Sequence, residues 1–129
     1  MKAIISLAAL CLVAAGLPST AAAGTCVAHV KRTACKGQSA ESYKKCEGKR
    51  ECDVPLDGSV ATAAECGEKV AKRDCPNARL EITHSKVVTA TLDGKPVTVE
   101  GQTDLCQTSY YPKAQRDKEF GVCKEAEKD

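Results

Sequence analysis

The sequence is poor in aromatic residues and has a single long hydrophobic run. It contains no Trp, one Phe and three Tyr. Few side chains can therefore stack on bases or sugar rings, which argues against binding of single-stranded nucleic acid and against a sugar-stacking groove. Nine Gly and five Pro in 129 residues exclude a collagen-like or proline-rich chain. One apolar run excludes a protein that spans a membrane several times, and the length suits one domain.

Catalytic and metal-binding patterns are also missing. After residue 23 the only histidines are His29 and His84, and no two cysteines there have the Cys-x2-Cys spacing of a zinc site. Gly58 and Ser59 do not belong to a Gly-x-Ser-x-Gly nucleophile motif, and no glycine-rich phosphate loop is present. We therefore predict a protein that is not an enzyme and holds no metal and no cofactor.

The hydrophobic run lies at the N-terminus. Lys2 precedes it, residues 3–17 are almost all apolar, and Ala21 and Ala23 occupy the small positions before a cleavage site. This arrangement is typical of a secretory signal peptide over residues 1–23. A membrane anchor is the alternative, but spanning a bilayer takes about 20 apolar residues. The sequence predicts export to the periplasm or the extracellular space, with no transmembrane span in the mature chain.

Cleavage after Ala23 would remove Cys11 and leave an even number of cysteines. In a small exported chain this predicts a framework of four disulfides. Its members are Cys26, Cys35, Cys46, Cys52, Cys66, Cys75, Cys106 and Cys123. The pairing stays open, although Cys46 and Cys52 are spaced for an ordinary loop-closing disulfide. Lipidation of Cys26 is an alternative, since small residues precede it, but the usual Leu three residues earlier is Ala23.

The mature chain has few residues with which to build a core. After residue 23 the large apolar side chains are ten Val, four Leu, one Ile and Phe120. Four disulfides would offset this shortage, since each contributes about 2–4 kcal/mol. We therefore expect residues 24–123 to form a single disulfide-stabilised domain that needs its cross-links to fold.

Local patterns predict a small α+β fold, in which short N-terminal helices precede a β-hairpin or small antiparallel sheet. Helices are expected over residues 25–36, 39–47 and 62–74, and the two Gly and Pro55 of residues 48–59 predict a loop. The alternative for residues 25–36 is a strand, since their two Val and Thr33 also suit one. At the start of the third helix, Thr62 and Glu65 have capping-box spacing. Cys66 and Cys75 point to opposite sides of this helix, so each of the two cysteines must bond to another element.

The hairpin is expected over residues 80–100. Asp93 and Gly94 separate two runs with alternating hydrophobicity, and an Asp-Gly pair favours a two-residue type I′ turn. In that register three cross-strand pairs form: Leu92 with Lys95, Ala90 with Val97, and Val88 with Val99. Pro96 indicates that its strand lies at an edge of the sheet. Residues 104–123 show no clear period, and residues 124–129 read as a charged tail that frays.

Charge is unevenly distributed along the mature chain. Residues 24–50 carry seven basic and two acidic side chains, whereas the remainder is net negative. The basic residues selected as a contact surface are Lys44, Lys45, Lys49 and Arg50. A second candidate surface is Tyr110 and Tyr111, because Tyr is enriched in interfaces. The alternatives are that the lysines only keep the protein soluble and that the tyrosines fill the core.

Three functions follow from these observations, in order of preference. The first is an exported, non-enzymatic binding or inhibitory module with an unknown protein partner, since a cross-linked scaffold lowers the ordering cost of binding. The second is a structural cell-envelope protein that binds anionic polymers or lipid headgroups through the basic lobe of residues 24–50. The third is a thiol-active or hydrolytic enzyme. No nucleic-acid partner is expected.

Overall fold

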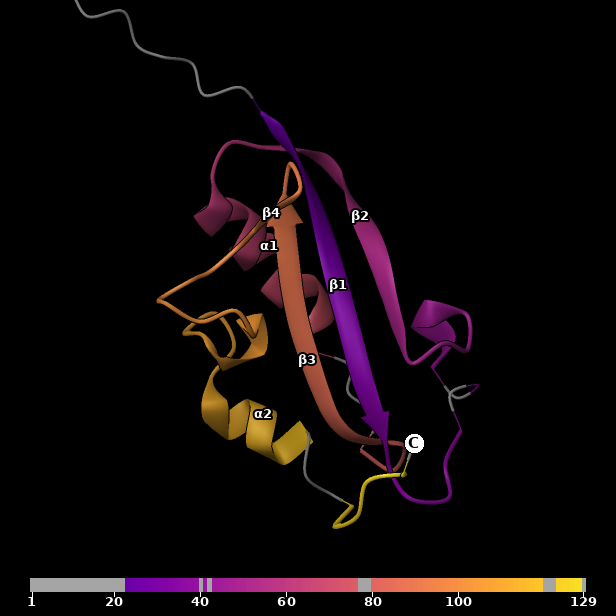
Figure 1. Cartoon of the computed structure of the whole chain (residues 1–129). Coiled ribbons are helices and arrows are strands. Elements are labelled where there is room, and N and C mark those ends of the chain that lie inside the picture. The colour runs from indigo at the N-terminus through magenta and orange to yellow at the C-terminus, as the bar shows by residue number, and fades with distance from the viewer. Residues whose placement is uncertain (1–22, 40, 42, 77–79, 120–122, 129) are drawn as a thin grey trace, which may run out of the picture.

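A computed structural model describes residues 23–39, 41, 43–76, 80–119 and 123–128. Its centre is a four-stranded antiparallel sheet of order β2-β1-β3-β4 (Figure 1). The strands are β1 (Gly24–Ala34), β2 (Glu51–Val60), β3 (Thr83–Leu92) and β4 (Lys95–Pro96). The helices are α1 (Ala63–Asp74) and α2 (Lys113–Glu119), and two 3-10 turns, η2 (Lys44–Cys46) and η3 (Leu105–Gln107), complete the elements. The predicted small, disulfide-rich α+β class is confirmed.

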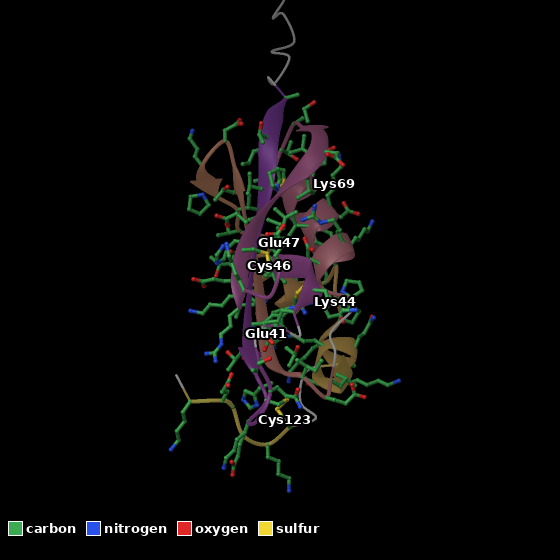
Figure 2. All side chains as sticks on the ribbon, turned by 90° about the vertical axis from the view of Figure 1, so that its right-hand side faces the viewer. Glu41, Lys44, Cys46, Glu47, Lys69 and Cys123 are labelled. Carbon is green, nitrogen blue, oxygen red and sulfur yellow. A yellow bond between two sulfur atoms is a disulfide. The ribbon has the colours of Figure 1, made fainter. Side chains whose placement is uncertain are left out.

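Both helices lie on the same face of the sheet. In Figure 1, α1 lies behind the sheet and α2 lies beside the lower part of β3; in Figure 2, which is turned by 90°, both helices lie to the right of the sheet. The core therefore forms between the sheet and α1, and the described helices leave the opposite face of the sheet open.

The predicted helix over residues 25–36 is wrong, because this segment is the strand β1. Its side chains alternate between buried and more exposed positions, with Cys26, Ala28 and Val30 fully buried. β1 pairs with β2 on one side and with β3 on the other, so that His29 lies between Asp53 and Thr89. Backbone pairing on both sides stabilises the extended form more than the hydrogen bonds of a short isolated helix would.

The next two expectations are also wrong. Of the predicted helix over residues 39–47, the described residues show only 3-10 conformation, at Glu41 and in the turn η2, and residues 40 and 42 lie outside them. The predicted loop over residues 48–59 is mostly the strand β2. Pro55 and Gly58 suggested a loop, but β2 is an edge strand, and edge strands tolerate both residue types.

The helix predicted from residue 62 onwards is confirmed as α1. The Thr62 hydroxyl accepts a hydrogen bond from the Glu65 backbone N–H at 3.1 Å, and the Glu65 carboxylate accepts one from Ala61 at 2.9 Å. This second bond holds the pKa of Glu65 below its usual value. Ion pairs one turn apart, Glu65–Lys69 and Glu68–Lys72, support the exposed side.

The hairpin turn is confirmed, but the hairpin is shorter than predicted. Asp93 and Gly94 have φ of 49° and 75°, as a type I′ turn requires, and Leu92 pairs with Lys95. The last bond of the expected register runs from Val97 N to Ala90 O at 2.8 Å. Beyond it the chain leaves the sheet: Val99 pairs with Gln102, and the Val88 N–H donates to the Asp104 carboxylate at 3.2 Å. Val88 and Val99 are nevertheless both buried in the core.

We expect Gly94→Val to lower the free energy of unfolding by about 1–2 kcal/mol, because a β-branched residue is strained at positive φ. Urea denaturation measures this difference. Lys95→Val is the matched control, since the same side chain is then placed one residue later, in the exposed strand β4. Equal stability of the two variants would contradict the assigned turn.

Four disulfides tie these elements together. They are Cys26–Cys66, Cys35–Cys123, Cys46–Cys52 and Cys75–Cys106. The two cysteines of the α1 region bond to other elements, as predicted, because Cys66 reaches β1 and Cys75 reaches η3. The Cys46–Cys52 disulfide closes a loop between η2 and β2. The core around these cross-links consists mainly of valines, with Leu105 and Tyr111.

The charged tail that was expected to fray is paired with the end of β1 and the chain beyond it over residues 125–127. Ala126 forms an antiparallel bridge with Cys35, beyond the end of β1. The predicted signal peptide lies outside the described residues apart from Ala23. In the described part of the chain, no helix has the length and apolar character needed to cross a membrane.

Candidate anion-binding groove

A surface groove of about 340 Å³ lies where the end of β1 meets the start of β2. Its basic lining residues come from two separate segments of the chain. Its lining residues are Lys31, Arg32, Thr33, Lys49, Arg50 and Glu51. Four cations against one carboxylate make this groove the candidate functional site, since converging Lys and Arg side chains bind carboxylate or phosphate groups.

Backbone pairing brings the two walls of the groove together. The Arg32 N–H donates to the Arg50 carbonyl at 2.9 Å, and Lys31 faces Glu51 across the strands. Neighbouring residues of a strand point to opposite faces. Arg32 is accordingly buried, whereas Lys31 is exposed.

Arg32 forms the fixed base of the groove. Only 6% of its surface is exposed, and its guanidinium lies 5.6 Å from the ring centre of Tyr43, which is also buried. This contact is a cation–π interaction. Burial raises the pKa of Tyr43, while the positive charges of Arg32 and Arg50 oppose the rise. The ring therefore stays neutral and holds the guanidinium in place.

The other three cationic side chains of the groove differ in their acidic partners. Lys31 lies 3.9 Å from Glu51, and both side chains are more than half exposed. Arg50 donates to the carboxylate of Glu127, in the C-terminal tail, at 2.5 Å. Lys49 is exposed and has no salt bridge within the described part of the chain. An incoming anion would thus meet one unpaired cation and one weakly held pair.

The structure separates the four lysine and arginine residues that the sequence grouped. Lys49 and Arg50 line the groove. Lys44 is exposed on η2, at the edge of the molecule that faces the viewer in Figure 2, and it does not line the groove. Lys45 also lies in η2, but its side chain falls outside the described set. Lys31 and Arg32 belong to the predicted basic lobe of residues 24–50 but were not among the residues predicted to make contacts.

The two tyrosines of the second predicted surface are buried or partly buried. Tyr111 is only 3% exposed and belongs to the core, and Tyr110 packs against that core. These positions agree with the alternative interpretation, in which the tyrosines fill a core that is short of large apolar residues.

A histidine near the groove has carboxylate partners that the sequence analysis missed. His29 Nδ1 lies 2.6 Å from the Asp53 carboxylate, and its Nε2 lies 3.9 Å from Glu51. The cluster arises because His29 and Asp53 face each other across β1 and β2. A period-2 reading of residues 24–34 would have placed His29 on the same exposed face as Lys31. Within the described residues, no group of three or more His, Cys, Asp or Glu side chains is arranged to hold a metal ion.

Comparisons with protein-family models, with curated proteins and with solved structures found no match to this chain.

Proposed function

We propose that this protein is an exported, non-enzymatic binding module that holds an anionic partner in its basic groove. The observation that carries this proposal is a groove lined by Lys31, Lys49 and Arg50 beside the buried Arg32. Such a cluster raises the local concentration of an anion and favours its association.

The disulfide framework supports the same proposal. All eight cysteines between residues 24 and 128 are in disulfides, which are typical of proteins in an oxidising compartment. Export to the periplasm or the extracellular space agrees with this chemistry. A rigid scaffold also reduces the entropy lost when a partner binds. A thiol-active function is less favoured, because it would first require reduction of one of these bonds.

Reversal of groove charges tests the proposal. We expect Lys49→Glu to weaken binding to immobilised poly-glutamate and to heparin by about tenfold, and Lys31→Glu/Lys49→Glu to weaken it further. The salt concentration needed for elution should fall in parallel, since salt screens exposed charges. Affinity chromatography and titration at several salt concentrations measure both effects.

Lys44→Glu is the matched control for this experiment. It makes the same change of charge at another exposed lysine of the predicted lobe, but outside the groove. We expect a smaller loss of affinity than for Lys49→Glu. Equal losses would show that binding depends on net charge alone, and retained binding in all variants would overturn the proposed function.

A further inference from the structure

The C-terminal tail occupies the edge of the sheet next to the groove. The Lys36 N–H donates to the Glu125 carbonyl at 3.0 Å, and the Glu127 N–H donates to the Ala34 carbonyl at 2.9 Å. β2 pairs with β1 only as far as the backbone hydrogen bond from the Arg32 N–H to the Arg50 carbonyl. The tail therefore takes the position that β2 leaves free, and it pairs as a short strand.

Two carboxylates of the tail contact two cations of the basic lobe. Glu125 accepts a hydrogen bond from Lys36 Nζ at 2.6 Å, and Glu127 accepts one from Arg50 Nη2 at 2.5 Å. The Lys36 and Glu125 side chains are largely exposed, whereas about a third or less of Arg50 and Glu127 is exposed. The basic lobe thus binds an extended segment whose carboxylates are two residues apart. Backbone hydrogen bonds and ion pairs between the lobe and the segment both contribute.

A covalent link holds the tail beside this edge. Cys123, seen at the lower end of the molecule in Figure 2, is bonded to Cys35, and its carbonyl lies 3.1 Å from His84 Nδ1. Residues 125–127 follow directly, so the tail is present at a high effective concentration, of the order of millimolar for a short tether. A tethered segment of this kind competes with any free segment of the same chemistry.

We propose that this edge is a docking site for an extended acidic segment of a partner protein, and that the tail fills it in the free protein. The proposal rests on the proposed function and names its partner. A polypeptide fits better than an anionic polymer, because the Lys36 N–H and the Ala34 carbonyl need a backbone acceptor and donor, as in strand addition. The two carboxylates supply the charge complementarity.

The test uses the full chain and a labelled peptide. The peptide Ac-KEAEKD-amide copies residues 124–129, and Ac-KQAQKD-amide lacks the two carboxylates of interest. In the variant Glu125→Lys/Glu127→Lys, the tail no longer complements Lys36 and Arg50. We expect this variant to bind the acidic peptide about tenfold more tightly than the unaltered protein does, and to bind the glutamine peptide about tenfold more weakly than the acidic one. Fluorescence anisotropy measures these affinities.

Two lysine substitutions in the tail variant localise the binding. Lys36→Gln should remove the gain, because Lys36 contacts the tail directly. Lys72→Gln should leave it, because Lys72 lies on α1, where it pairs with Glu68 and not with the tail. If the tail variant does not fold, as judged by circular dichroism, a chain ending at Cys123 replaces it.

The remaining outcomes separate the two proposals. If the folded tail variant binds the acidic peptide no better than the unaltered protein does, or binds both peptides equally, the docking site is refuted. A gain for heparin without a gain for the acidic peptide would assign the edge to an anionic polymer and leave the proposed function standing. Loss of poly-glutamate and heparin binding in Lys49→Glu, together with no peptide binding, would refute the docking site alone.

Discussion

Replacing Cys26 and Cys66 together by alanine should lower the free energy of unfolding by about 4 kcal/mol. The disulfide joins the central strand β1 to α1 and closes a loop with a sequence separation of 40. Both cysteines are fully buried. Loss of the bond frees the unfolded chain, and the smaller side chains leave space in a core that consists mainly of valines. Chemical denaturation and the melting temperature report the change.

Replacing Cys46 and Cys52 by alanine is the control for this prediction. That disulfide has a sequence separation of only 6, so the same chain-entropy argument gives about 2 kcal/mol. We therefore expect the double variant at Cys26 and Cys66 to be clearly the less stable of the two. The reverse order would show that the stability of the fold does not depend on the attachment of α1 to β1.

Lys86→Met should lower the free energy of unfolding by about 2–4 kcal/mol. Lys86 lies on β3, is only 1% exposed, and directs its ammonium group at the C-terminal end of α1. It donates hydrogen bonds to the backbone carbonyls of Asp74, Cys75 and Pro76, the latter two at 3.0 and 3.5 Å. A cation at this end of a helix binds the unpaired carbonyls and interacts favourably with the helix dipole. Methionine preserves the length of the side chain but removes the donor.

Lys72→Met provides the comparison for Lys86→Met. Lys72 lies on α1 itself, is exposed, and forms a surface ion pair with Glu68. Its replacement should change the free energy of unfolding by less than about 0.5 kcal/mol, since exposed pairs contribute little. Urea denaturation of both variants tests the prediction. Similar stabilities would mean that the carbonyls at the end of α1 find other donors when Lys86 is absent.

The elements that were predicted correctly are those with strong local signals. The Asp93-Gly94 turn forms because two adjacent residues accept positive φ. The start of α1 forms because Thr62 and Glu65 satisfy backbone N–H groups within one turn. In each case the deciding interactions lie within a few residues, so the local sequence contains the information.

The N-terminal strands were missed because their stability comes from distant partners. Residues 25–36 contain Ala, Lys and Arg, which favour helix, beside Val and Thr, which favour strand. The choice is made by β2 and β3, which lie tens of residues further along the chain. For β2, Pro55 and Gly58 indicated a loop, and only its place at the edge of the sheet makes them acceptable.

The candidate site shows the same division between local and distant information. Counting charges placed the basic character in residues 24–50, which contains Lys31, Lys49 and Arg50. The count could not distinguish Lys49 from Lys44, because strand pairing decides which lysine lines the groove. It could not associate Glu127 with Arg50 either, since these residues are 77 positions apart.

By itself, the sequence determined the disulfide-rich class, the α1 helix, the hairpin turn and the position of the basic lobe. Composition, the even number of cysteines after residue 23 and short-range hydrogen bonds are sufficient to predict these features. Tertiary structure alone decided the disulfide pairing, the strand β1 at the centre of the sheet, the burial of Tyr111 and the place of the acidic tail. Each of these depends on contacts between residues far apart in the chain, whose free energy is gained only when the sheet assembles.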